Sequence, residues 1–220
     1  MTGGVPRPVP GTTAVVPLRD GVSGKSRLAA VLDAGSRRRL VRVLARHVVT
    51  TLLAADGIGR VVVVTADPAF ARETLAGLDV EVLEQPAGRP GLNAALEYAR
   101  EVLAARGPLL VTHADLPALS PADVAALLAT DAPLVVATDR YRSGTNLLLL
   151  RAEDDAGRAF RFRFGVGSLA AHLAEAEARG LGATVVHRPG TAVDLDTADD
   201  WSQLPDEVRV AVGQQVPGLL

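Results

Sequence analysis

The sequence predicts a single layered α/β domain built around a mainly parallel β-sheet. Strand-like and helix-like segments alternate from one end of the chain to the other, which is the pattern of such domains. The strand-like segments are short, β-branched and nearly all apolar, as expected of strands that helices cover on both faces. The chain has 220 residues, of which 48% are hydrophobic, so one domain can bury a substantial core.

The order of these segments fixes the expected elements. We predict strands at residues 13–18, 60–65, 80–83, 108–112, 134–137, 146–150 and 184–187. Helical spacing predicts helices at residues 36–55, 69–76, 92–106, 121–129 and 168–179. Ser36 and Ser120 are expected N-caps, and Pro121 occupies the first-turn position that proline favours. No repeat or interdomain linker interrupts this order.

The two ends of the chain differ from the domain between them. Residues 1–11 carry three prolines and three glycines and no apolar run, so we expect a disordered lead and no secretory signal. The domain is predicted over residues 12–205, followed by a C-terminal tail at 206–220. Runs of large aliphatic residues, such as 61–64 and 147–150, have four residues, far fewer than the roughly 20 needed to cross a bilayer. We therefore expect a cytoplasmic protein without a membrane partner.

Composition excludes several classes of function. The chain has 23 basic and 25 acidic residues, so it has no overall positive charge with which to bind a nucleic-acid backbone. The absence of cysteine excludes disulfides, thiolate catalysis and cysteine zinc sites. The four histidines lie in separate segments, which disfavours a histidine metal site. Any bound anion must be held by a local cluster, and Lys25 is the only lysine that could contribute to one.

The first such cluster is the loop at residues 19–27, which directly follows the first strand. Ligands of open α/β sheets bind beyond the carboxyl ends of the strands. The loop combines glycines and hydroxyls with the cations Arg19, Lys25 and Arg27, and a helix begins after it, so it suits a phosphate. A solvated turn with surface arginines is the alternative. The loop is not a P-loop, because the spacing to Gly24 requires a glycine where Arg19 stands.

Carboxylates follow two other strands. Asp115 comes after the strand at 108–112, and Asp194 and Asp196 come after the last strand. Alternate residues of an extended chain point to the same side, so Asp194 and Asp196 could converge with Asp115 on one hard cation such as Mg²⁺. Turn and helix capping is the alternative role, for Asp115 before Pro117 and for Asp196 before the next helix.

A third cluster spans residues 160–168, where three phenylalanines alternate with two arginines. This alternation fits a strand, whereas the glycines before Ser168 fit a small anion site at the start of a helix. Thr145 could add a hydroxyl to the same ligand. His113 and His172 are candidate phosphate contacts or structural hydrogen-bonding residues. The sequence lacks a Gly-x-Ser-x-Gly elbow, which disfavours covalent catalysis.

Taken in order, these motifs resemble one family over nearly the whole domain, the CofC/FbiD family of phospholactate or phosphoenolpyruvate guanylyltransferases of coenzyme F-420 biosynthesis. The resemblance rests on Val16-Pro17-Leu18, Gly24-Lys25-Ser26-Arg27-Leu28, Gly91-Leu92-Asn93-Ala94-Ala95, Asp115-Leu116-Pro117, Ser143-Gly144-Thr145-Asn146, Phe164-Gly165 with Ser168 and His172, and Asp194 with Asp196-Thr197. Arg19 and Ala114 depart from the family pattern, which commonly has lysine and glycine there.

The resemblance implies a three-layer nucleotidyltransferase fold of the glycosyltransferase-A type, with a mainly parallel mixed sheet. It implies that Gly24, Lys25 and Asn93 bind the nucleotide and that Asp115, Asp194 and Asp196 bind Mg²⁺. It further implies that Thr145, Gly165 and Ser168 bind the acceptor. Lys25, Arg27 and Arg19 would then stabilise the charge that develops during the reaction.

The implied reaction joins the phosphate of a small 2-phospho acid to the α-phosphorus of GTP and releases pyrophosphate. Phosphoenolpyruvate is favoured as acceptor because the arginine-rich composition suggests an actinobacterial type of source, while 2-phospho-L-lactate and 3-phospho-D-glycerate stay open. The alternatives are a molybdenum-cofactor guanylyltransferase or other nucleotidyltransferase, a P-loop-like kinase, and a nucleotide-binding module without catalysis. A homodimer would be compatible with the sequence.

Overall fold

The computed structural model describes residues 11–19, 25–103, 107–216 and 218–219. Seven strands form one sheet in the order β3-β2-β1-β4-β6-β5-β7. Only β6 among these strands is antiparallel to its neighbours, β4 and β5. The strands are β1 (Thr12–Pro17), β2 (Ile58–Thr65), β3 (Glu81–Glu84), β4 (Leu109–Thr112), β5 (Leu134–Thr138), β6 (Thr145–Leu150) and β7 (Ala183–Val186). The predicted mainly parallel mixed sheet is confirmed.

The five predicted helices are also present, and the chain forms further short ones. The helices are α1 (Ala34–Leu53), α2 (Pro68–Thr74), α3 (Leu92–Leu103), α4 (Pro121–Ala129), α5 (Asp155–Ala159), α6 (Ser168–Ala178), α7 (Ala198–Ser202) and α8 (Asp206–Gln215), with 3₁₀ turns η1 (Ser26–Leu28) and η2 (Pro189–Thr191). In the part of the chain that is described, no helix is both long and apolar enough to span a membrane.

Two predicted helix starts have different outcomes. Ser120 caps α4 as expected, in a capping box with Asp123 and with Pro121 in the first turn. The prediction that Ser36 caps α1 is wrong. Asp33 is the N-cap, and its carboxylate accepts a hydrogen bond from the Ser36 backbone N–H, so Ser36 lies inside the first turn.

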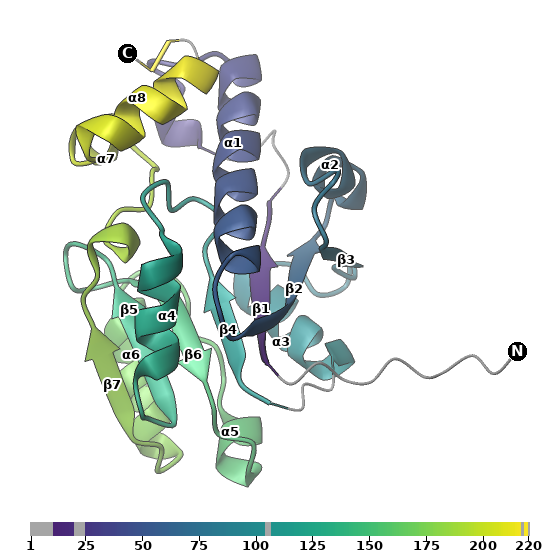
Figure 1. Ribbon diagram of the computed structural model, residues 1–220. Coiled ribbons are helices and arrows are strands. Elements are labelled where there is room, and N and C mark those ends of the chain that lie inside the picture. The colour runs from purple at the N-terminus through teal and green to yellow at the C-terminus, as the bar shows by residue number, and fades with distance from the viewer. Residues whose placement is uncertain (1–10, 20–24, 104–106, 217, 220) are drawn as a thin grey trace, which may run out of the picture.

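Helices cover both faces of the sheet and make three layers (Figure 1). Alternate residues of each strand face opposite layers, as the two-residue period of a strand requires. In β2, Val61 and Val63 pack with α1, α2 and α4, whereas Val62 and Val64 pack with α3, α6 and the segment 160–164. This explains why the strands read as continuous apolar runs in the sequence.

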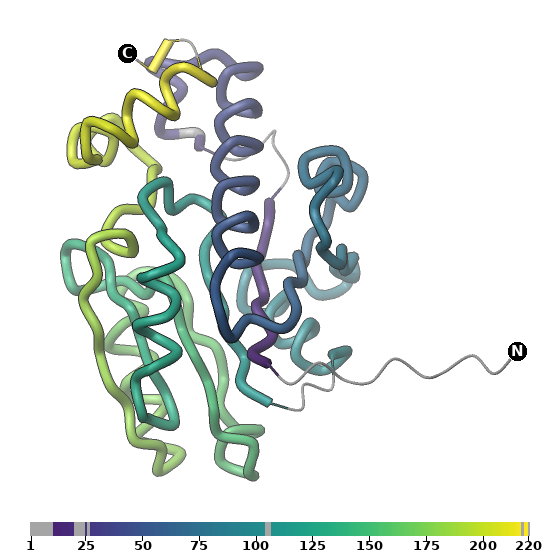
Figure 2. The backbone as a smooth tube through the Cα atoms, viewed as in Figure 1, coloured from purple at the N-terminus to yellow at the C-terminus, as the bar shows by residue number. Residues whose placement is uncertain are grey.

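A third apolar cluster joins α8 to α1. Val212 and Val216 are buried with Leu40 and Leu44 of α1 and with Leu195, and the C-terminal part of the chain lies against one end of α1 (Figure 2). Segment 206–220, expected as a tail, therefore contains a packed helix. Full burial of one such aliphatic side chain contributes about 1.5–3 kcal/mol, which is enough to dock a short helix.

The sheet topology collects several candidate residues at one edge. The carboxyl ends of β1, β4, β5 and β7 meet there because these strands are parallel to one another through β6. Since β6 is antiparallel, its first residue, Thr145, lies at the same edge. The loops that carry Lys25, Asp115 and Asp194 leave from this edge, as the rule for open α/β sheets predicts.

Candidate active site

Lys25 joins the carboxylates of two loops that are distant in the sequence. Its Nζ lies 2.5 Å from Asp115 Oδ2 and 2.7 Å from Asp196 Oδ1. The Lys25 side chain is only 6% exposed, so this ammonium is a buried charge held by two carboxylates. Lys25 has a φ of 60°, a left-handed conformation that is uncommon for residues other than glycine. Such strain often marks a functional position.

The backbone fixes the distance between the two acidic loops. The Leu195 N–H donates to the Asp115 carbonyl at 3.0 Å, so the residues on either side of Leu195 lie beside Asp115. Leu195 and Leu116 are both fully buried and anchor their loops in the core. The structure thus places the loops that carry Asp115, Asp194 and Asp196 next to each other, while binding of one metal ion by these residues stays a prediction.

The charges at this edge perturb one another. Burial alone would lower the pKa of Lys25, but Asp115 and then Asp196 outweigh it and hold that pKa above its ordinary value. Burial would raise the pKa of Asp115, but Lys25 and then His113 hold it below its usual range. Burial, followed by the charge of Asp115, raises the pKa of Asp194. The site therefore holds the Lys25 ammonium between two carboxylates, and Asp194 is a third carboxylate without an equal counter-charge.

The donor chemistry of these residues fits a hard divalent cation. Asp115 Oδ1 is buried and has no hydrogen-bond partner among the described residues, although a buried carboxylate oxygen normally has one. Mg²⁺ prefers carboxylate oxygens of this kind. Among the described residues, no three acidic or histidine side chains are arranged so that they could hold a metal ion. The Lys25 ammonium lies between Asp115 and Asp196 instead.

A cavity of about 600 Å³ lies at the carboxyl ends of β1, β2 and β3, at the same edge of the sheet as this ion pair, although Lys25 and its two carboxylate partners do not line it. This volume is in the range of small-molecule sites. Gly91 and the first turn of α3, through Leu92 and Ala95, close one side of the cavity. Gln85, directly after β3, donates to the Gly91 carbonyl at 3.1 Å and so holds this wall. Exposed Arg19 is part of its rim. We call this space the β1–β3 cavity.

The other predicted nucleotide contacts are placed less directly. Gly24 lies outside the described residues. Arg27 belongs to η1 and is exposed. Asn93 is not among the residues that line the β1–β3 cavity, because its amide is engaged elsewhere. Its Nδ2 donates to the Phe164 carbonyl and its Oδ1 accepts from the Phe164 N–H, both at 2.9 Å.

Two of the three predicted acceptor residues, Thr145 and Ser168, form a buried cluster with His172. The Thr145 N–H donates to Ser168 Oγ at 2.8 Å, and Thr145 Oγ1 lies 3.0 Å from His172 Nδ1. Thr145 is 2% exposed and Ser168 is 3% exposed. Gly165, by contrast, is exposed and has a φ of 143°, which favours glycine. The cluster therefore holds the 165–168 loop at its last residue, Ser168.

The hydrogen bonds assign the protons of His172. Its Nε2 accepts from the Arg163 N–H at 2.9 Å, so the neutral ring carries its proton on Nδ1 and donates it to Thr145 Oγ1. Burial is the main cause that lowers the pKa of His172 to about 4, which keeps the ring neutral at physiological pH. The Thr145 hydroxyl accepts from His172 and keeps its own proton for a further acceptor.

Several residues around the site are not evident from the sequence. Arg140, after β5, pairs with Asp199 at 2.5 Å and with Asp200 at 3.0 Å, which ties this edge to α7. Glu97 of α3 and Glu175 of α6 contact the segment before Gly165. No local motif indicates these residues, because their partners are distant in the sequence. Only their charge on otherwise apolar helix faces could have drawn attention to them.

Known proteins resemble this chain in both sequence and fold. Residues 12–205 match the model of the family described as guanylyl transferase CofC like. The chain is 44% identical to a phosphoenolpyruvate guanylyltransferase of Rubrobacter xylanophilus, over 87% of this chain and 92% of the relative. It is 32% identical to a 2-phospho-L-lactate guanylyltransferase of Methanothermobacter thermautotrophicus, over 88% and 83%.

The fold comparison agrees with these sequence matches. The structure of a nucleotidyl transferase from Methanothermobacter matches with a TM-score of 0.65 and 23% identity, over 91% of this chain and 99% of that one. The predicted nucleotidyltransferase fold is thereby confirmed. With the fold, the order of the motifs and the family match in agreement, this chain belongs to the CofC-like guanylyl transferase family.

Proposed function

We propose that this protein transfers GMP from GTP to the phosphate of a small phosphorylated carboxylic acid. The observation that supports this most strongly is the Lys25 ammonium, buried between Asp115 and Asp196 at the same edge of the sheet as the β1–β3 cavity. A cation and paired carboxylates at such an edge suit the binding of a triphosphate. The names of the sequence relatives agree with this assignment.

The proposal includes Mg²⁺ bound by Asp115 together with Asp194 or Asp196. Asp115 Oδ1, which has no hydrogen-bond partner among the described residues, supports this choice, and Asp194 lies near enough to Asp115 for the charge of Asp115 to raise its pKa. When bound, Mg²⁺ would neutralise negative charge on the triphosphate and on departing pyrophosphate. The residues next to these carboxylates, Leu116 and Leu195, are fully buried and anchor the two loops, so little ordering is needed on binding.

The chain's own cations would do the remaining electrostatic work. Lys25 would contact the phosphates of GTP, and Arg19 and Arg27 would add charge at the rim of the cavity. An oxygen of the acceptor phosphate forms the new bond to the α-phosphorus, while the bond between that phosphorus and the bridging oxygen breaks. The electron pair leaves with pyrophosphate. The second pKa of a phosphate monoester is about 6, so the attacking oxygen is ionised near pH 7 and needs no general base.

The acceptor is proposed to bind at the 165–168 loop. The Thr145 hydroxyl, oriented by His172, and the exposed backbone at Gly165 would recognise the carboxylate or phosphate of the acid. We favour phosphoenolpyruvate because the relative at 44% identity carries that name. The 2-phospho-L-lactate enzyme at 32% identity makes that acid the next choice. Either product would serve the biosynthesis of coenzyme F-420.

The direct test incubates the protein with GTP, Mg²⁺ and each acid in turn, and measures both pyrophosphate release and product mass. We expect a product whose mass is the acid plus GMP, less water, with phosphoenolpyruvate giving the highest rate. Reactions with ATP or CTP serve as nucleotide controls. Absence of any GMP adduct with phosphoenolpyruvate, 2-phospho-L-lactate and 3-phospho-D-glycerate would reject the proposal.

A further inference from the structure

Residues 161–164 run extended outside the sheet, and side chains take the place of a partner strand. Phe162 and Phe164 are buried, whereas Arg161 and Arg163 face solvent, as in a strand. No regular strand is assigned there. Instead, each of the four backbone N–H groups donates to a side chain of α3 or α6. Extended backbone normally obtains such bonds from a neighbouring strand.

Helix α3 holds the even-numbered residues. The Phe162 N–H donates to Glu97 Oε1 at 3.0 Å, and the Phe164 N–H donates to Asn93 Oδ1 at 2.9 Å. Asn93 also donates back to the Phe164 carbonyl. Asn93 and Glu97 are four residues apart, so they lie on one face of the helix, one turn from each other. This spacing matches the separation of alternate residues in the extended segment.

Helix α6 holds the odd-numbered residues in the same way. The Arg163 N–H donates to His172 Nε2 at 2.9 Å, and the Arg161 N–H donates to Glu175 Oε1 at 3.2 Å. His172 and Glu175 are three residues apart and share a helix face. His172 also packs against Phe164 with ring centroids 4.7 Å apart. The segment is thus held on both sides.

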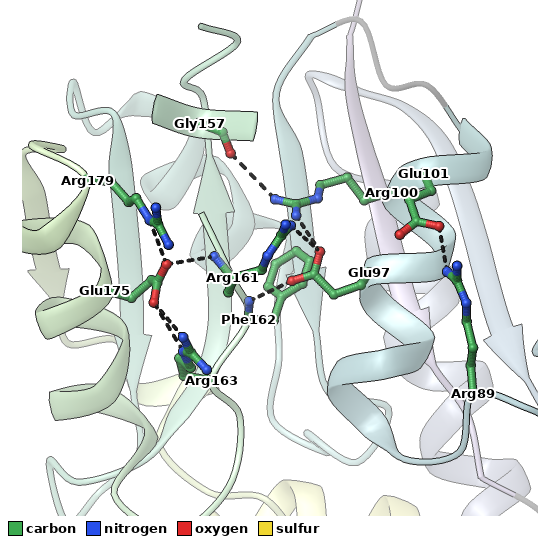
Figure 3. A network of polar contacts seen from close by, with 10 residues as sticks. All are labelled: Arg89, Glu97, Arg100, Glu101, Gly157, Arg161, Phe162, Arg163, Glu175 and Arg179. Carbon is green, nitrogen blue, oxygen red and sulfur yellow. Dashed lines mark hydrogen bonds and ion pairs between the residues drawn. The ribbon is translucent and has the colours of Figure 1, made fainter. Parts of the chain in front are cut away.

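Both glutamates pair with arginines (Figure 3). Glu97 pairs with Arg100 and lies 3.6 Å from Arg161 Nη1. Glu175 is 7% exposed and pairs with Arg163 at 2.8 Å and Arg179 at 2.9 Å. Charged acceptors of this kind make stronger hydrogen bonds than neutral ones. Each carboxylate therefore has one oxygen for the backbone of the segment and further contacts to lock its rotamer.

We propose that Asn93, Glu97, His172 and Glu175 are positioning residues that hold the extended segment 161–164 and thereby fix the 165–168 loop for the acceptor acid. This inference rests on the proposed function of that loop. The segment enters the loop directly at Gly165, and the far end of the loop is held by the Leu169 N–H, which donates to the Ser143 carbonyl at 3.0 Å. The loop is therefore anchored at both ends, and its exposed backbone is free to contact a ligand.

The test compares Glu97→Ala with Glu97→Gln. Glu97→Ala removes the acceptor of the Phe162 N–H, and we expect the KM for the acceptor acid to rise about tenfold, the effect of losing roughly one buried hydrogen bond. The KM for GTP should change by less than about twofold, because Glu97 does not line the β1–β3 cavity. Glu97→Gln keeps an oxygen for Phe162, so it should restore most of the acceptor affinity.

Glu101→Ala is the matched control. Glu101 lies one turn further along α3 and, among the residues drawn in Figure 3, pairs only with Arg89, so its loss should leave both KM values unchanged. Equal acceptor KM values in Glu97→Ala and wild type would overturn the inference. So would equal values in Glu97→Gln and Glu97→Ala, because the effect would then come from the ion pairs and not from the bond to Phe162.

Hydrogen exchange of the ligand-free protein separates this inference from the proposed function. In Glu97→Ala, amides of peptides covering residues 160–168 should exchange about tenfold faster than in wild type, while those of β4 keep their protection. Unchanged exchange in that peptide would overturn the inference whatever the activity. If the wild type has no guanylyltransferase activity but Glu97→Ala shows the expected faster exchange, only the proposed function is rejected.

Discussion

The Lys25 ammonium lies 2.5 Å from Asp115 Oδ2, although 90 residues separate the two in the sequence. This pair links the loop after β1 to the loop after β4, the two neighbouring strands at the centre of the sheet. A buried pair of this kind is weak evidence for stability, because desolvation offsets much of the attraction. Its position at the same edge of the sheet as the β1–β3 cavity makes it a natural target for testing catalysis.

Asp115→Asn should abolish turnover while the protein stays folded. The amide keeps the shape of the side chain and Lys25 retains Asp196, but one carboxylate for the cation is lost. We expect the rate to fall at least about a hundredfold, the typical effect of removing one preorganised contact. Pyrophosphate release and the melting temperature measure the two effects. Asp155→Asn, on exposed α5, is the control, and a near-normal rate in Asp115→Asn would contradict the metal assignment.

Lys25→Met should increase the response of the ligand-free protein to Mg²⁺. The substitution removes the cation between Asp115 and Asp196, so a divalent ion meets two carboxylates without a competing ammonium. We expect Mg²⁺ to raise the melting temperature of the variant by several degrees more than that of wild type, because ligands stabilise the state that binds them. Thermal denaturation at constant ionic strength measures this difference. Equal Mg²⁺ responses would argue against a shared cation position.

Stability should fall when the pH drops from 7 to 5. The pKa of His172 is about 4 in the folded protein and near 6.5 when unfolded, so only the unfolded chain takes up a proton in this window. The stabilisation is therefore present above pH 6.5 and is lost as the pH falls toward 4. The expected loss between pH 7 and pH 5 is about 2 kcal/mol.

Urea denaturation at both pH values measures this loss in wild type and in His172→Asn. The asparagine keeps a donor for Thr145 but does not titrate, so its stability should depend less on pH by that amount. The difference between the two proteins also removes the contribution of His47, whose pKa burial likewise lowers. Identical pH dependence in the two proteins would show that His172 is not the titrating group.

Gly190→Ala should be strongly destabilising, in contrast to Gly88→Ala. A Cβ at Gly190 would lie 2.1 Å from Asp123 Oδ2 and 2.6 Å from the Ala118 carbonyl oxygen, so the α4 capping box would have to shift. Overpacking of this kind costs about 1–3 kcal/mol. A Cβ at Gly88 meets nothing within 4 Å. Chemical denaturation of both variants gives the comparison, and equal stability would contradict the close packing of η2 on α4.

Much of the fold follows from the sequence because its strands are buried on both faces. Each of the seven predicted strands overlaps an observed one, with ends that differ by no more than two residues. Helix α8 was not predicted, because its apolar side chains contact α1 and Leu195, which lie elsewhere in the sequence. The local pattern of the segment does not indicate these contacts. The same limit applies to α5, which is only one turn and a half long.

The candidate site was likewise predictable from the sequence only in part. Asp115, Asp194 and Asp196 were predictable because each follows a strand that ends at one edge of the sheet. The role of Asn93 was not, since its partner Phe164 is 71 residues away and only the fold brings them together. Ala114, which replaces a frequent family glycine, is not among the residues with positive φ, so this departure places no strain on the loop of Asp115.

Helix α3 borders both proposed substrates, since Gly91 and Leu92 line the β1–β3 cavity while Asn93 and Glu97 grip the chain before the 165–168 loop. A small rotation of α3 would therefore displace residues at both proposed binding sites. Thermodynamic reciprocity then requires that any factor by which nucleotide tightens the acceptor is matched by an equal factor in the other direction. The order in which the two molecules arrive would change the route to the ternary complex and leave its free energy the same.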